Sequence, residues 1–162
     1  MTTPLLLDVP QDLLQRYGTS GPRYTSYPTA VDWRNNFDPA QYAERLARVA
    51  HRDESLSVYV HIPFCEARCY FFGCNDVITR NHDKAKDYLD ALEREFAAVK
   101  ATGIGRRPVR QYHWGGGTPT FLRPDELRRL QDLFLSTFTV APDSEVAIEV
   151  DPRHTSEEQV RL

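Results

Sequence analysis

The chain has 162 residues, of which 41% are hydrophobic and 27% are charged, a balance typical of a single globular domain with a hydrophobic core. Its formal net charge of −3 argues against a nucleic-acid surface, which needs a basic face. No apolar run approaches the length of a membrane span, so we expect no membrane contact.

The N-terminus and the cysteines indicate the compartment. The first residues, MTTPLLLDVPQDLL, have no basic residue before the leucines and no small-residue cleavage site, so we expect no signal peptide. All the cysteines, Cys65, Cys69 and Cys74, lie within one stretch of ten residues. An odd and closely spaced set does not make a disulfide framework and indicates metal binding in a reducing, cytoplasmic environment.

Residues 1–56 are predicted to form an N-terminal arm. A short helix is expected near residues 10–17, ending at Gly18. The stretch SGPRYTSYPTAVDW that follows is too rich in proline, glycine and serine for regular structure. Within it Arg23 could pair with a carboxylate, although a packed extended segment is the commoner reading. A second helix is predicted to start at Asp38, which serves as its cap before a proline.

Residues 57–162 are predicted to form a domain in which strands alternate with helices. This alternation favours an α/β fold with a parallel sheet and helical crossovers. The predicted elements are a strand over 57–62, a helix over 84–103 capped by Asp83 and closed by Gly103, a strand over 109–114, a helix over about 125–137, a strand over 144–150, and a helix beginning at Thr155 or Ser156.

The alternation within the strands predicts two different faces. Val58, Val60 and Ile62 share the face that packs against helices, whereas Tyr59 and His61 share the other face. In the third strand the apolar face is formed by Val146, Ile148 and Val150, and Glu145, Ala147 and Glu149 oppose it. A polar face of this kind is expected in a barrel with a functional interior. The loops PFCEARCYFFGC, GGGTPT and DPR each follow a strand, so they should meet at one end of the sheet.

The cysteine loop has three possible uses. Closely spaced thiolates can hold an iron–sulfur cluster or a soft metal. Zinc is an alternative, with His61 as a fourth ligand, although the alternation predicts that His61 is an interior histidine with its hydrogen bonds satisfied. Buried, inert cysteines are the third reading and the least favoured one, because the residues follow a strand and lie among proline, glycine and arginine.

Two further features are ambiguous when each is considered alone. Three glycines, Gly115 to Gly117, directly follow the second strand, and their backbone could approach a ligand closely, although the glycines alone slightly favour a plain flexible turn. Glu149 ends the third strand on its polar face. A carboxylate at that place suits the hydroxyls of a ribose, and a solvent-facing glutamate is the alternative.

Taken together, YVHIPFC with the cysteines after it, YHWGGGTPT and IEVDP resemble the radical S-adenosylmethionine enzymes. Within them the chain is most similar to the oxygen-independent coproporphyrinogen III oxidases (dehydrogenases) of haem biosynthesis. The arm SGPRYTSYPTA and the GCN after the cysteine loop favour the oxidases over the related haem-chaperone branch. The resemblance extends over nearly the whole chain.

The resemblance implies a fold and a reaction. The fold is a partial, six-stranded β/α barrel, and the three strands predicted here would be its first half, preceded by the N-terminal arm. A four-iron four-sulfur cluster and S-adenosylmethionine generate a deoxyadenosyl radical, which starts the oxidative decarboxylation of two propionates of coproporphyrinogen III to vinyl groups. The product is protoporphyrinogen IX. An electron donor is required, a second S-adenosylmethionine is bound, and the family implies a monomer.

The resemblance also assigns roles to residues of this chain. Cys65 and Cys69 match the first two cluster ligands. Contacts to the first S-adenosylmethionine match Tyr59, Gly116 and Glu149, and contacts to the second match Phe71, Gly117 and Thr118.

The chain departs from the family pattern in two ways. The family loop reads C-x3-C-x2-C, but Phe72 stands at the third position, and Cys74, two residues further on, is an alternative donor. The sequence also stops one turn into its third crossover helix, which predicts an uncovered sheet edge. We therefore expect an incomplete or degenerate copy of the oxidase. The alternatives are a non-catalytic protein that binds zinc or a labile cluster, and a haem-chaperone-like radical protein with another substrate.

Overall fold

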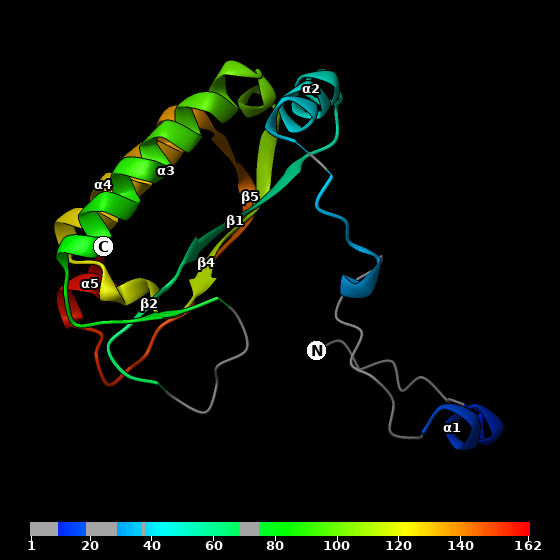
Figure 1. The fold of residues 1–162 in the computed structure, drawn as a ribbon, viewed down its shortest axis with the longest axis horizontal. Helices are drawn as coiled ribbons and strands as arrows, with labels where there is room; N and C mark the ends of the chain where they lie inside the picture. The colour runs from blue at the N-terminus through cyan, green and yellow to red at the C-terminus, as the bar shows by residue number, and fades with distance from the viewer. Residues whose placement is uncertain (1–9, 19–28, 37, 69–74) are drawn as a thin grey trace. The chain divides into compact units, whose positions relative to one another are not determined.

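The computed structural model describes residues 10–18, 29–36, 38–68 and 75–162 (Figure 1). The chain divides into two compact units, Met1–Phe37 and Asp38–Leu162. The helix predicted after Asp38 belongs to the second unit. The boundary expected at residue 56, between an arm and a barrel domain, stays a prediction.

The described part of the first unit contains two short helices. Helix α1 spans Gln11–Tyr17 and ends at Gly18, as predicted from the sequence. The 3-10 helix η1 spans Ala30–Asp32, and the hydroxyl of Thr29 donates to the carboxylate of Asp32 at 2.8 Å. Most of the segment between these helices, which was predicted to be irregular, lies outside the described residues.

The second unit is built on a parallel sheet, which confirms the predicted α/β arrangement. Its three strands, in spatial order, are β1 (Leu56–Ile62), β4 (Pro108–Gly116) and β5 (Thr139–Ile148), and both neighbouring pairs are parallel. A separate parallel pair is formed by β2 (Phe64–Cys65) and β3 (Val77–Ile78). The register pairs Tyr59 with His113 and Trp114 with Ile148.

The helices of this unit follow the predicted alternation with the strands. Helix α2 (Pro39–Val49) starts where expected, because the Asp38 carboxylate accepts the Gln41 N–H at 2.8 Å. Helices α3 (Asp83–Ala101) and α4 (Pro124–Thr137) pack against each other along one face of the sheet (Figure 1). Short 3-10 turns, η2 (Ile104–Arg106) and η3 (Pro119–Phe121), precede and follow β4. Helix α5 (Glu157–Arg161) is capped by Ser156.

Two predicted boundaries were wrong. Asp83 is the first residue of α3 rather than its cap, and its own N–H donates to Asn81 Oδ1 at 3.0 Å. The third strand begins at Thr139 and ends at Ile148 rather than spanning 144–150. Its pairing with β4 shifts between Val109 and Gln111, because the segment around Pro142, which has no N–H, leaves the ladder.

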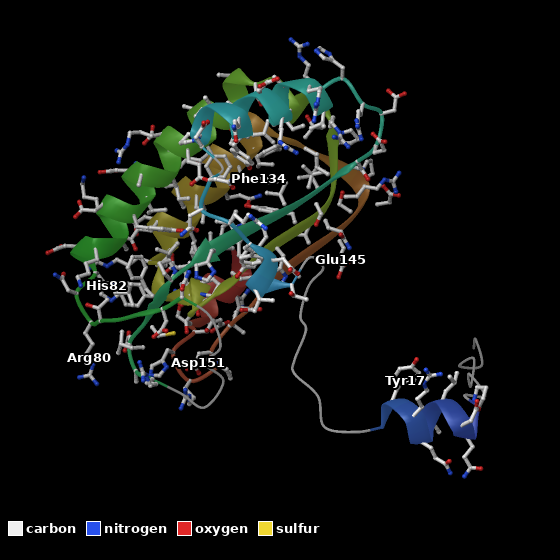
Figure 2. All side chains as sticks on the ribbon, turned by 45° about the vertical axis from the view of Figure 1, so that its right-hand side comes forward. Tyr17, Arg80, His82, Phe134, Glu145 and Asp151 are labelled. Atoms are coloured by element: carbon white, nitrogen blue, oxygen red, sulfur yellow. The ribbon has the colours of Figure 1, made fainter. Side chains whose placement is uncertain are left out.

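The core lies between the sheet and the paired helices. Ile62, Val109, Leu89 and Leu130 have no exposed surface, and neither does Phe134, which Figure 2 labels. The ring of Phe134 stacks on Tyr112 of β4 at 3.5 Å between ring centres. Val60 and Ile62 of β1 belong to this cluster, which confirms that their face of the strand packs against helices.

The apolar face of β5 is more open than that of the other strands. Val146 is 62% exposed and Ile148 is 44% exposed, which fits the predicted uncovered sheet edge. No helix among the described residues is long and apolar enough to cross a membrane.

A buried arginine joins α2 to the rest of the unit. Arg107 is 9% exposed, and its guanidinium donates to the carbonyls of Val49, Glu54 and Ser55 at 3.1, 2.6 and 3.4 Å. These carbonyls belong to the end of α2 and to the turn that leads into β1. Arg107 therefore fixes the start of β1 beside the start of β4.

Candidate functional site

The loops after β1 and β4 are joined by their backbones. The Gly117 N–H donates to the carbonyl of Ile62 at 2.8 Å, and the Thr118 N–H donates to that of Phe64 at 2.8 Å. The loop after β5 starts beside them, because the Glu149 N–H donates to the Trp114 carbonyl at 2.9 Å. The three loops thus meet at the carboxyl ends of the strands, as the parallel arrangement predicted.

Cys65 is the cysteine that the structure places at this meeting point. Its side chain is buried, and its Sγ lies 3.1 Å from Oγ1 of Thr118. The backbone around it is held by β3, since the Thr79 N–H donates to the Cys65 carbonyl at 2.9 Å. A cavity of about 20 Å³ adjoins the thiol and is also lined by Asp151 and His154.

The other residues of the cysteine loop lie outside the part of the chain that the structure describes. These are Cys69 and Phe71, both predicted site residues, with Phe72 and Cys74. Arg23 of the arm lies outside it as well. Within the described ranges, no three histidine, cysteine, aspartate or glutamate residues form a group that could hold a metal ion.

Glu149 and Gly116 form the centre of the site. The Gly116 N–H donates to Oε2 of Glu149 at 3.1 Å. The φ of Gly116 is +121°, and a Cβ there would lie 2.8 Å from Nδ1 and Cε1 of His61. The Ile62 carbonyl oxygen lies equally close to that Cβ position, so only glycine fits here.

Tyr59 lies on the same open face of the sheet and is 54% exposed. Its ring is stacked nearly parallel to that of His113, at 5.8 Å and 12°. Its hydroxyl lies 3.0 Å from Nδ1 of His61, and Nε2 of His61 lies 2.8 Å from the Asn75 carbonyl. A carbonyl only accepts, so Nε2 donates to it, and in the neutral ring Nδ1 accepts from Tyr59. The prediction that His61 has its hydrogen bonds satisfied is confirmed.

The loop after β5 is organised by Asp151 (Figure 2). The guanidinium of Arg153 donates to both oxygens of this carboxylate, at 3.0 and 2.7 Å, and Nδ1 of His154 lies 3.1 Å from it. The hydrogen bonds from Arg153 hold the pKa of Asp151 well below its usual range. The sequence indicated this loop but no residue within it.

His113 is a site residue that the sequence reasoning missed. Its Nε2 lies 3.4 Å from Oε1 of Glu149, while its ring faces Tyr59. The signal was present in the sequence, because the period of two along YHWGG puts His113 on the polar face of β4. Its partners, Tyr59 and Glu149, follow only from the register between the strands.

No family model matches the chain. An oxygen-independent coproporphyrinogen III oxidase of Salmonella typhimurium is 50% identical over 141 residues, which cover 87% of this chain and 30% of that protein. One from Mannheimia haemolytica is 49% identical over 140 residues, which cover 86% of this chain and 94% of that protein. The chain belongs to the oxygen-independent coproporphyrinogen III oxidase family. It spans about 30% of the length of the Salmonella member.

A solved structure supports the same membership. A coproporphyrinogen III oxidase from Escherichia coli, which is a radical SAM enzyme, superposes with a TM-score of 0.75 at 43% identity. The match covers 89% of this chain and 31% of the Escherichia coli protein. The family resemblance and the partial radical SAM fold predicted from the sequence are therefore confirmed for this member of the oxidase family.

Proposed function

We propose that the strand-end site binds S-adenosylmethionine and belongs to an oxygen-independent coproporphyrinogen III dehydrogenase. The reaction is the oxidative decarboxylation of two propionates to vinyl groups, with coproporphyrinogen III as substrate and an external electron donor. The observation that carries the proposal is the hydrogen bond from the Gly116 N–H to Glu149, which sets a half-exposed carboxylate at the glycine loop. Within the described part of the chain Cys65 forms no disulfide, which suits a reducing cytoplasm.

The residues divide into two groups of contacts. Tyr59, Gly116 and Glu149 would hold the first S-adenosylmethionine, with Glu149 accepting from the ribose hydroxyls. Gly117 and Thr118, with Phe71, would contact a second one. The contacts of the glycine loop support this division, because the Gly116 N–H donates to Glu149 whereas the Thr118 hydroxyl lies against the thiol of Cys65.

The nucleoside of S-adenosylmethionine fits the residues present. The side chain of Glu149 is 52% exposed, and its carboxylate can accept from hydroxyls. Bound S-adenosylmethionine supplies hydrogen-abstraction chemistry, and the chain supplies its orientation through Tyr59 and Glu149.

The family's cluster fits less well. The chain supplies thiolates at Cys65 and Cys69, but the third ligand position holds Phe72, which has no lone pair for a metal. Without a thiolate from Cys74, these two are too few for the three-thiolate site of the family. In the zinc alternative His61 would have to give up a hydrogen bond to bind the metal, since both of its ring nitrogens have partners.

The test compares Glu149→Ala with Glu145→Ala in a calorimetric titration with S-adenosylmethionine. Glu145 lies on β5, which ends just before Glu149, and its carboxylate is near Gln111 rather than the glycine loop. Loss of the charged acceptor at Glu149 should weaken binding by about 10-fold or more, and the control should bind as the parent chain does. Equal affinity in all three proteins would remove Glu149 from the site.

A further inference from the structure

We infer that His113 is a positioning residue that orients the carboxylate of Glu149 toward the ribose of the bound nucleoside. The inference rests on the proposed function, because it assigns a role within the S-adenosylmethionine site. It adds a residue to which neither the sequence motifs nor the family resemblance gave a role.

The first argument is the geometry of the carboxylate. Oε2 of Glu149 accepts the Gly116 N–H at 3.1 Å, and Oε1 lies 3.4 Å from Nε2 of His113. One contact to each oxygen fixes the rotation of the carboxylate about its last bond. Without His113, the hydrogen bond to Gly116 alone would leave that rotation free, since two oxygens could exchange at the same N–H.

The second argument is how His113 is itself held. It is paired in register with Tyr59 on the neighbouring strand, and the two rings are stacked at 12°. The hydroxyl of Tyr59 is held in turn by Nδ1 of His61. A chain of side chains on the polar face therefore runs from His61 through Tyr59 and His113 to Glu149, and each contact fixes the next.

The third argument is exposure. The side chains of His113 and Glu149 are 39% and 52% exposed, so the contact between them is open to solvent. A contact between exposed groups adds little to folding stability, as measured ion pairs at protein surfaces do. Its effect should fall on the placement of the carboxylate, and so on ligand binding rather than on unfolding.

The test uses two nucleosides that need no cluster for binding, 5′-deoxyadenosine and 2′,5′-dideoxyadenosine. They differ only in the ribose 2′-hydroxyl. Glu149 would accept a hydrogen bond from that hydroxyl. Dissociation constants are measured by NMR titration for the parent chain and for His113→Phe, which keeps a ring over Tyr59 and removes Nε2. His113→Gln keeps a donor without the ring, and His51→Phe, at an exposed turn after α2, is the matched control.

We expect His113→Phe to weaken binding of 5′-deoxyadenosine by about 3- to 10-fold, with little change for the 2′-deoxy nucleoside. His113→Gln should retain most of the preference for the 2′-hydroxyl, and His51→Phe all of it. All four proteins should unfold at the same temperature.

Three results would overturn the inference. Equal losses for both nucleosides in His113→Phe would show a general disturbance of the site. An unchanged constant for 5′-deoxyadenosine would show that Glu149 needs no partner at Oε1. If His113→Gln loses the preference as fully as His113→Phe does, the donor is not the reason. Failure of the parent chain to bind either nucleoside would instead overturn the proposed function, and this inference with it.

Discussion

The thiol of Cys65 and the hydroxyl of Thr118 lie 3.1 Å apart, which joins the loop after β1 to the loop after β4 at the one cysteine that the structure places. A thiolate that binds a metal can only accept at this contact, so the hydroxyl must donate to it. The residue assigned to an S-adenosylmethionine contact is thus also a partner of the first proposed cluster ligand.

The first prediction concerns this contact. Thr118→Val keeps the shape of the side chain and removes the hydrogen-bond donor. Iron held at Cys65 should then be lost to a chelator about 3- to 10-fold faster, because the thiolate loses one hydrogen bond. Thr118→Ser should restore the parent rate. Both are measured in the Phe72→Cys background after anaerobic reconstitution. Identical rates in the valine and serine variants would show that the hydroxyl does not support the thiolate.

The second prediction concerns the third ligand position. Anaerobic reconstitution of the parent chain should leave substoichiometric iron, whereas Phe72→Cys should approach about four irons per chain with matching sulfide. Phe72→Ser, which removes the ring without adding a thiol, is the control and should resemble the parent.

A variant of Cys74 gives the result that would contradict this prediction. If the parent chain already holds a full cluster, and Cys74→Ala abolishes it, then Cys74 is the third ligand. About one zinc per chain with little iron would favour the zinc alternative.

The third prediction compares two glycines with positive φ. Gly116→Ala combines backbone strain with a Cβ placed 2.8 Å from the His61 ring, so we expect a loss of about 2–4 kcal/mol in unfolding free energy. Gly103→Ala has φ of +79° but no atom closer than 4.0 Å to its new Cβ, so strain alone should cost about 1 kcal/mol. Urea unfolding measures both. Equal losses would mean that His61 moves aside at no cost.

The fourth prediction concerns Arg107. Arg107→Met keeps the buried stem and removes the donors to three carbonyls, which should cost about 2–4 kcal/mol of unfolding free energy. Arg106→Met, at an exposed neighbour, should stay within about 0.5 kcal/mol of the parent. Chemical denaturation measures the unfolding free energy of the two variants. If Arg107→Met lowers it only slightly, water replaces the hydrogen bonds of the guanidinium.

The fifth prediction is a loss of stability at alkaline pH. Burial raises the pKa of Tyr88 to about 12 and also raises that of Tyr112, whereas an unfolded tyrosine titrates near pH ~10. Between these values the unfolded chain releases protons that the folded chain keeps, so the unfolding free energy should fall as pH rises above about 10.

The variants for this test are Tyr88→Phe and Tyr112→Phe. Each should flatten the alkaline fall measured by urea unfolding at a series of pH values, because each removes one group that titrates differently in the two states. Tyr42→Phe, at an exposed residue of α2, is the control. A fall of unchanged steepness in both core variants would locate the titration elsewhere.

The meeting of Tyr59, Cys65, Gly116 and Glu149 at one end of the sheet could be predicted from the sequence. The prediction needs only two local rules, the alternation of side chains along a strand and the common direction of parallel strands. Both hold whatever the details of packing.

What the sequence could not predict depended on competition between groups. Asp83 was expected to cap α3, but Asn81 lies two residues earlier and accepts the Asp83 N–H instead. The start of β5 was missed because Pro142 interrupts the ladder while pairing continues on both sides of it. The contacts of Arg107 with the end of α2 and of His113 with Glu149 join residues far apart in the chain, so only the tertiary structure brings them together.

The backbone bonds from Gly117 to Ile62 and from Thr118 to Phe64 make the glycine loop and the start of the cysteine loop move as one piece. A displacement of either loop must carry the other along or break both bonds. Thermodynamic linkage then requires that any factor by which an occupied glycine loop tightens metal binding at Cys65 equals the factor by which the metal tightens nucleoside binding. The nucleoside constant measured with and without iron therefore gives the coupling free energy between the two loops.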